Sequence, residues 1–141
     1  VQALHAPTNL LVTGAVDDLW VNARGELIVV DYKSTAKAAE ITALNEDWHS
    51  GYKRQIEIYQ WLLRQNGFKV SPTAYWVYAN GDAGAERFDQ TLTFRMTVIP
   101  YEGSDHWVDD HVVAAKNCLM QKAPPLAADD CEYCEFVSRR A

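Results

Sequence analysis

An apolar run that ends abruptly in two opposite charges constrains the fold of this 141-residue chain more than any other stretch. Residues 27–30 are Leu-Ile-Val-Val, and Asp31, Tyr32 and Lys33 follow directly. The run predicts a buried strand. Side chains two positions apart in a strand point to the same face. We therefore expect Asp31 and Lys33 to lie side by side at the margin of the core.

A second strand precedes this one in a hairpin that covers roughly residues 11–33, and residues 22–25 predict a tight connection in which Gly25 can adopt a positive φ. With a three-residue loop at 23–25, the expected register pairs Val21 with Leu27, Leu19 with Val29 and Asp17 with Asp31. Directly opposite residues have Cβ atoms roughly 4.5–5.5 Å apart, so both carboxylates could bind one cation. A register slip of one residue would replace Asp17 by Asp18.

Two carboxylates at that separation on a half-buried face repel each other unless a metal ion or a proton neutralises them. Hard oxygen ligands suit Mg²⁺ or Mn²⁺. The pattern therefore indicates a candidate metal site. The competing interpretation is a surface salt bridge between Asp31 and Lys33 at a strand end.

Length and composition indicate one soluble globular domain, which we place at residues 1–125, followed by a tail at 126–141 with a C-x-x-C motif. No apolar run approaches the roughly 20 residues of a membrane span. The net charge of −6 by itself argues against nucleic-acid binding. Residues 24–69, however, hold seven basic side chains against six acidic ones.

The remaining pattern predicts alternating strands and helices. The clearest helix covers residues 52–65, with Ser50 as N-cap and Gly67 as the stop. Further strands are expected at residues 73–79 and at 90–99, the latter with Leu92, Phe94, Met96 and Val98 on its buried face and with an end at Pro100. A helix follows at about 105–121, capped by Ser104, with Ala115 and Leu119 among its inward-facing residues. The order predicts an α/β or α+β fold with a mixed sheet.

Three motifs in this order resemble the PD-(D/E)XK nuclease superfamily, and more narrowly its RecB-like exonuclease branch, which includes CRISPR-associated nucleases. They are residues 14–17 (G-x-x-D), residues 31–35 (D-Y-K-[ST]) and residues 55–59 (Q-x-x-x-Y). The resemblance covers about residues 12–80. It implies a restriction-endonuclease-like mixed sheet flanked by helices, and a Mg²⁺- or Mn²⁺-dependent deoxyribonuclease.

The resemblance also implies roles for individual residues. Asp17, Asp31 and the backbone carbonyl of Tyr32 would ligate the metal. Lys33 would orient the attacking water or stabilise the transition state. Gln55 and Tyr59 would line the same site, although Tyr59 could equally be a core aromatic residue and Gln55 a solvated edge residue.

Members of this branch carry a histidine on a helix well upstream of the first aspartate, whereas His5 lies only twelve residues before Asp17. The chain opens on Val1 rather than methionine, which fits an excised domain whose upstream helix lies elsewhere. We expect the four histidines to be surface or capping residues. Some members hold an iron–sulfur cluster on four cysteines; Cys131 and Cys134 match only part of that group, so we expect no cluster from this chain alone.

The three cysteines, with no secretory signal, suggest a reducing cytoplasm. The expected function is hydrolysis of DNA in recombination, repair or phage-type processing, with DNA and other subunits of such a complex as partners and no membrane. The alternative is an inactive nuclease-fold module that binds DNA or serves a structural role in a helicase–nuclease assembly. A third interpretation makes the tail C-x-x-C half of a zinc site.

Overall fold

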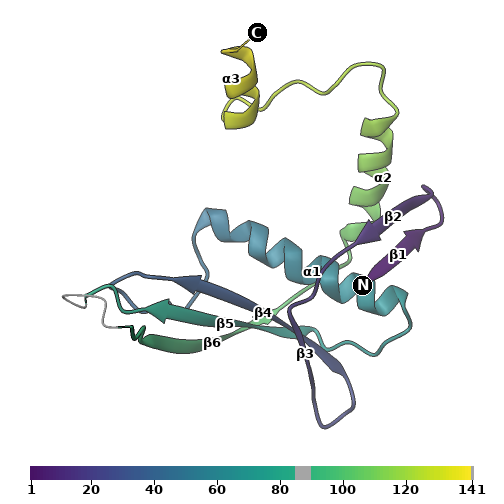
Figure 1. The fold of residues 1–141 in the computed structure, drawn as a ribbon. Helices are drawn as coiled ribbons and strands as arrows, with labels where there is room; N and C mark the ends of the chain where they lie inside the picture. Colours follow the sequence, from purple (N-terminus) through teal and green to yellow (C-terminus); the bar gives the residue numbers. More distant parts are fainter. Residues whose placement is uncertain (85–89, 141) are drawn as a thin grey trace.

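The computed structural model describes residues 1–84 and 90–140, and Figure 1 shows the course of the chain. The elements are β1 (Gln2–His5), β2 (Leu10–Thr13), β3 (Asp18–Val21), β4 (Leu27–Thr35), the short 3-10 helix η1 (Asp47–His49), α1 (Ser50–Gln65), β5 (Thr73–Gly81), β6 (Phe94–Glu102), α2 (Val108–Leu119) and α3 (Glu132–Ser138). Within this part of the chain, β1 and β2 form a hairpin and the other four strands form one sheet in the order β3-β4-β5-β6. The predicted mixed α/β fold is confirmed.

The centre of the sheet is the parallel pair β4 and β5, flanked by antiparallel β3 and β6. Parallel neighbours need a crossover that returns the chain to the same end of the sheet, and α1 lies within that connection. Figure 1 shows α1 lying across the sheet. Leu27 and Val29 of β4 therefore belong to the core that α1 covers.

The predicted register of the β3–β4 hairpin is confirmed where the two strands pair: Leu19 lies opposite Val29, and Val21 opposite Leu27. Gly25 has a φ of 72°, as the turn requires. Asp17 lies one residue before β3, so the predicted ladder pair with Asp31 does not form.

The first predicted hairpin was too long at its start. Residues 10–13 pair with β1 instead, in the register that sets Leu4 opposite Leu11. The turn between these strands is stabilised by Thr8, whose backbone N–H and hydroxyl both donate to the carbonyl of His5, and by Asn9 in the left-handed region with a φ of 57°. Alternation over four residues was too short a signal to reveal it.

Helix α1 matches the predicted segment except at its start. Ser50 is its first helical residue rather than its N-cap, because η1 precedes it and Glu46 forms a capping box with His49. At the other end Gly67 has a φ of 81° and stops the helix, as predicted. His49 is therefore a capping residue as expected, but it is buried.

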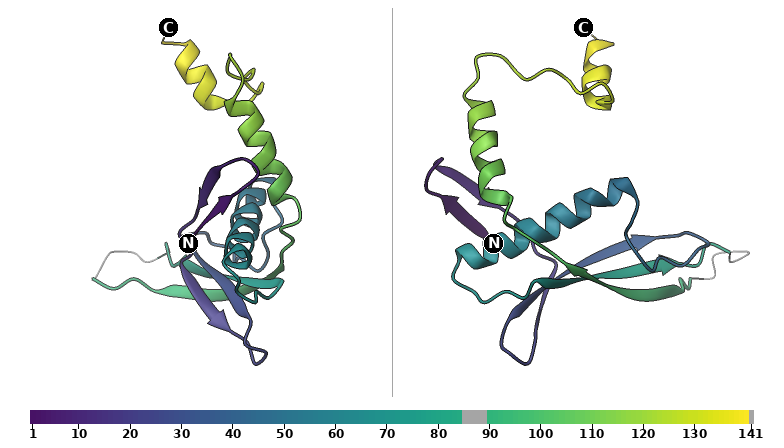
Figure 2. Two further views of the ribbon diagram at one scale, coloured as in Figure 1. Left: turned by 90° about the vertical axis from the view of Figure 1, so that its right-hand side faces the viewer. Right: turned by 180° about the vertical axis from the view of Figure 1, so that it is seen from behind.

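The hydrophobic core lies between α1 and one face of the sheet. Ile56 and Leu62 of α1 are fully buried, and they belong to one cluster with Val29, Trp76 and Ile99 of the sheet. Burying a side chain of this size stabilises the fold by about 1.5–3 kcal/mol. Figure 2 shows α1 on one side of the sheet, with no described helix on the other.

The predicted burial of β6 was wrong. Phe94, Met96 and Val98 are 49%, 58% and 51% exposed. Pairing of Ile99 with the core residue Trp76 turns the odd-numbered residues of β6 towards α1 and the even-numbered ones towards the uncovered face. The alternation was a true strand signal, but it could not say which face the helix would cover.

Pro100 lies inside β6, although a strand end was predicted there. In the described sheet β6 is an edge strand. A proline is tolerated at an edge, because its missing N–H can face away from the neighbouring strand.

Glu57 of α1 joins the helix to the end of β6 and the start of α2. Its buried carboxylate accepts hydrogen bonds from the Tyr101 hydroxyl at 2.7 Å, the Ser104 backbone N–H at 3.1 Å and Trp107 Nε1 at 2.7 Å. Ser104 was predicted to cap α2. The helix instead begins at Val108, because the Ser104 N–H is held by Glu57.

The tail after α2 leads to α3, where Cys134 lies within the helix and Cys131 directly before it. Ala115 and Leu119 of α2 were expected in the core but are exposed. In the described part of the chain no helix is long and apolar enough to span a membrane. The division at residue 125 stays a prediction.

Replacing Glu57 by alanine removes a buried anionic acceptor and leaves three donors without it. We expect the free energy of unfolding to fall by about 3 kcal/mol, because each hydrogen bond to a charged group contributes about 1.5–3 kcal/mol. Urea unfolding followed by circular dichroism measures this. The exposed Glu132→Ala is the control, and a loss no larger than in that control contradicts the role of Glu57.

Candidate functional site

Asp31 is buried in β4, directly after the apolar run, and is only 1% exposed. It points to the α1 side with Val29 because the two residues are two positions apart. Its Oδ2 forms an ion pair with Lys33 Nζ, whereas Oδ1 has no hydrogen-bond partner among the residues the structure describes. A buried carboxylate oxygen without a partner is costly and marks a place where a further positive charge would fit.

Burial raises the pKa of the Asp31 carboxyl above its usual range. The ammonium of Lys33 opposes this shift, and the negative charge of Asp17 adds to it. Both carboxylates are acceptors when ionised, so neither can satisfy the other without a proton or a cation between them. The electrostatic signature expected from the sequence is therefore present.

Asp17 reaches Asp31 from the segment before β3. Its Oδ2 accepts a hydrogen bond from the Tyr32 backbone N–H at 2.9 Å, which holds the carboxylate beside β4. Asp18 instead accepts from the Tyr32 hydroxyl at 2.8 Å, and Tyr32 is half exposed. Asp18 pairs with Val30 and so lies on the other face of the sheet. The register slip that would exchange the two aspartates has not occurred.

Lys33 connects β4 to α1. Besides its ion pair with Asp31, its Nζ donates to Gln55 Oε1 at 3.4 Å and lies 4.7 Å from the centre of the Tyr52 ring. Gln55 Nε2 in turn donates to the Tyr59 hydroxyl at 2.8 Å. A continuous polar chain thus runs from the sheet to the helix. The structure brings together the five residues singled out in the sequence, which are Asp17, Asp31, Lys33, Gln55 and Tyr59.

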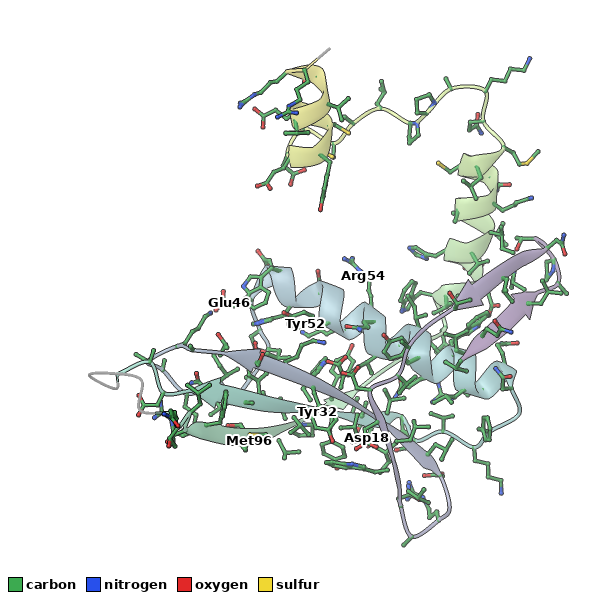
Figure 3. All side chains as sticks on the ribbon, in the orientation of Figure 1. Asp18, Tyr32, Glu46, Tyr52, Arg54 and Met96 are labelled. Carbon is green, nitrogen blue, oxygen red and sulfur yellow. The ribbon has the colours of Figure 1, made fainter. Side chains whose placement is uncertain are left out.

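Tyr59 is 8% exposed and belongs to the core, so the structural interpretation of this residue holds alongside its place at the site. Sequence reasoning missed Tyr52, whose ring faces Lys33. Figure 3 shows Tyr52 between α1 and the sheet, and Arg54 on the outer side of the helix. Tyr52 lies three residues before Gln55 on the same face of the helix, and this spacing was the signal that the sequence offered.

Gly14 allows the N-terminal segment to cross α1 closely enough to place Asp17. A Cβ atom at this position would lie 2.7 Å from Tyr59 Cε1 and 3.1 Å from Leu62 Cδ1. Real Cβ atoms do not approach that closely, so only glycine fits. This is a physical reason for the glycine three residues before the aspartate.

A surface groove runs along α1 next to these residues. Gln55 and Tyr59 form one wall, and the exposed Arg54 contributes a positive charge. The groove is therefore open to solvent and continuous with the polar chain from Lys33. Its other lining includes Thr13, Gly14, Gly51 and Trp107.

Side chains supply only part of the ligand set that a divalent cation needs. Within residues 1–84 and 90–140, no group of three or more His, Cys, Asp or Glu side chains could hold a metal ion. The carboxylates of Asp17 and Asp31 offer only oxygen ligands. Asp31 Oδ1 has no hydrogen-bond partner among the described residues and is therefore free to coordinate. Such a set suits a hard ion that keeps several water ligands.

Comparison with known proteins is consistent with this geometry. A family model described as the PD-(D/E)XK nuclease superfamily matches residues 2–139. The chain belongs to the PD-(D/E)XK nuclease superfamily. No curated protein and no solved structure matches it. Membership of this superfamily implies a nuclease that acts on nucleic acid. Nucleases of this superfamily typically use divalent metal ions.

Asp31, Tyr32 and Lys33 lie on β4, one of the two inner strands of the sheet. His5, which was expected at the surface, is instead 7% exposed. Its Nδ1 is hydrogen-bonded to Thr8 Oγ1 at 2.8 Å, and its Nε2 lies 3.4 Å from Asp109 Oδ1. His5 therefore takes part in contacts that join β1 to α2.

Asp31→Asn tests whether the buried carboxylate of Asp31 destabilises the fold when it is ionised. Because the folded-state pKa is raised above about 3.9, the unfolded value, the folded chain holds this proton more tightly and loses stability as the pH rises between the two values. Asparagine does not titrate. Relative to the parent chain in EDTA, the thermal midpoint of the variant should be about 3 °C higher at pH 8 than at pH 4, whatever the constant cost of leaving Lys33 without its ion pair.

Differential scanning fluorimetry at both pH values measures this difference. Asp129→Asn removes an exposed carboxylate in the tail and is the matched control. A difference between variant and parent that is the same at both pH values contradicts a buried carboxylate that favours its proton.

Gly14→Ala tests the close approach of the N-terminal segment to α1. We expect a loss of about 2 kcal/mol in the free energy of unfolding, because the added methyl group overpacks against the Tyr59 ring. At Gly51, in the first turn of α1, a Cβ meets nothing within 4 Å, so Gly51→Ala is the control. Equal stability of the two variants in urea unfolding would show that the crossing adapts.

Proposed function

We propose that this chain is a Mg²⁺- or Mn²⁺-dependent deoxyribonuclease of the RecB-like type, which removes nucleotides from DNA ends in recombination, repair or phage-type DNA processing. The observation that carries the proposal is the arrangement around Lys33, whose ammonium contacts both the buried Asp31 carboxylate and Gln55. The order of the three motifs supports the RecB-like assignment. DNA and further subunits of a processing complex are the proposed partners.

Asp17, Asp31 and the backbone carbonyl of Tyr32 would hold the ion. The two carboxylates converge from different segments, and the hydrogen bond from Tyr32 N–H keeps Asp17 in place. Phosphate oxygens and waters would complete the coordination. A bound ion of this kind polarises the phosphoryl oxygen and lowers the pKa of a coordinated water.

Lys33 is placed to act on the phosphate. Without a cation, its ammonium is held by Asp31. With a cation held by Asp31, the Lys33 ammonium would orient the attacking water or stabilise charge that develops on the phosphate oxygens. Its aliphatic chain is largely buried, with 16% of the side chain exposed, so little orientational freedom is lost on reaction.

Gln55 and Tyr59 would act as positioning residues. Gln55 accepts from Lys33 through Oε1 and donates to Tyr59 through Nε2, so its amide orientation is set from both sides. The groove beside them, with Arg54 at its wall, is where the phosphate backbone would lie. An arginine suits this position because its guanidinium binds phosphate through two parallel hydrogen bonds.

Hydrolysis of a labelled linear DNA in Mn²⁺ tests the proposal. We expect Asp31→Ala and Lys33→Ala each to lower the rate by at least about 100-fold, the effect of removing one transition-state stabiliser. Lys69→Ala removes an exposed lysine outside the site and is the matched control. Full activity in both site variants would contradict the proposal.

A second candidate is a nuclease-fold module that binds DNA without cleaving it. It is favoured by the absence of a third acidic, histidine or cysteine ligand among the described residues. Calorimetry with Mn²⁺ separates the two. Binding that disappears in Asp31→Ala supports the nuclease, whereas no binding at millimolar metal supports the inactive module.

A further inference from the structure

Trp48 is an exposed aromatic side chain that the core does not use. It lies in η1, just before α1, and is 53% exposed. Large aromatic rings are usually buried or at an interface, since they expose much apolar area to water. The position of this ring on the approach to α1, beside the proposed site, invites a functional explanation.

The Trp48 ring is held in a defined orientation. Its centre lies 3.7 Å from that of the His49 ring and 5.6 Å from that of Tyr52, which meets it edge-on. His49 is itself fixed, because it is 4% exposed and its Nδ1 accepts a hydrogen bond from the Glu46 backbone N–H at 3.0 Å. A ring that is already ordered loses little entropy when a ligand stacks on it.

The ammonium group of Lys37 lies over the Trp48 ring. Lys37 Nζ lies 5.5 Å from the centre of the Trp48 ring, and its backbone is anchored to Asn80 by hydrogen bonds of 2.9 Å in both directions. Burial, as the largest cause, lowers the pKa of His49, and Lys37 and Lys53 lower it further, so both ammonium groups act on this turn. The opposing charges are Glu46, which raises that pKa, and the exposed Asp47.

Trp48 is connected to the proposed site through Tyr52. One ring edge meets Trp48, and the Lys33 ammonium lies over the same Tyr52 ring. Figure 3 shows Glu46 at the end of α1 that carries this turn, with Tyr52 beneath the helix. A strand whose phosphate lay at Lys33 would therefore pass Trp48 with a neighbouring nucleotide.

We propose that Trp48 is a stacking platform for an unpaired base of the substrate strand, with Lys37 as a contact to its phosphates. The proposal rests on the proposed nuclease function and narrows its substrate to single-stranded DNA or an unpaired DNA end. An exposed aromatic ring beside lysines is how proteins bind single strands without sequence preference. In a duplex the faces of internal bases are covered by their neighbours, so only an unpaired base can stack on the ring.

The test is fluorescence anisotropy of a labelled oligothymidine strand with the full chain in EDTA, where no hydrolysis occurs. We expect Trp48→Ala to weaken binding about 10-fold, the effect of losing one base–aromatic stack, and Trp48→Phe to stay close to the parent chain. Trp20→Ala is the matched control, because Trp20 is 37% exposed and lies on the face of the sheet opposite α1. Circular dichroism verifies that each variant is folded.

A strand of the same length whose nucleotides lack their bases decides between stacking and charge. The parent chain should bind it about 10-fold less tightly than oligothymidine, and Trp48→Ala should bind both strands equally. The proposal is overturned if Trp48→Ala binds oligothymidine like the parent chain, if Trp20→Ala loses as much, or if no single strand binds. An apolar protein partner at Trp48 would give the first of these results.

Hydrolysis in Mn²⁺ of a small phosphodiester without a nucleobase separates this proposal from the nuclease function. The parent chain should cleave it, since hydrolysis of this ester needs the proposed metal site but no stacking. If the parent chain binds oligothymidine through Trp48 but hydrolyses nothing, the nuclease function fails and the platform stands. If it hydrolyses the small ester while Trp48→Ala keeps full affinity for the strand, the platform fails and the nuclease function stands.

Discussion

The buried carboxylate of Asp31 is the constraint on which the site depends. An ionised group placed at the end of an apolar strand, 1% exposed, destabilises the fold unless a positive charge faces it. Lys33, two residues later on the same face, supplies that charge and is in turn held by Gln55 on α1. Because the lysine must reach both partners, β4 and α1 have to lie at one separation and in one register.

A comparison of two buried carboxylates on the same scaffold separates structure from function. Glu57 is 9% exposed and accepts three hydrogen bonds from two segments, so its charge is satisfied by the fold. Asp31 has an oxygen with no hydrogen-bond partner in the described part of the chain, and a like charge from Asp17 nearby. The hydrogen bonds of Glu57 join α1 to the start of α2. The negative charge at Asp31 is not fully compensated, which is typical of active sites.

The part of the site that is local in the chain could be predicted. Same-face placement of Asp31 and Lys33 follows from the two-residue period of a strand, and the hairpin register follows from a turn with a glycine at positive φ. The polar chain from Lys33 to Tyr59 could not be derived from spacing, because it depends on how α1 packs on the sheet. Resemblance to a known family brought Gln55 and Tyr59 in, and their contacts were visible only in the structure.

The errors have a common physical origin. In β6 the alternation of Phe94, Met96 and Val98 with polar residues indicated a strand, but the pairing of Ile99 with Trp76 decided which face α1 would cover. Ser104 was chosen as a cap from its position alone, whereas the carboxylate of Glu57, 47 residues away, holds its N–H. By itself the sequence determined the four strands of the main sheet, the main helix and the charges at the strand end, because these depend on neighbours in the chain. The tertiary structure alone decided which carboxylate is satisfied and which ring stays exposed, because packing of distant segments sets the burial of each group.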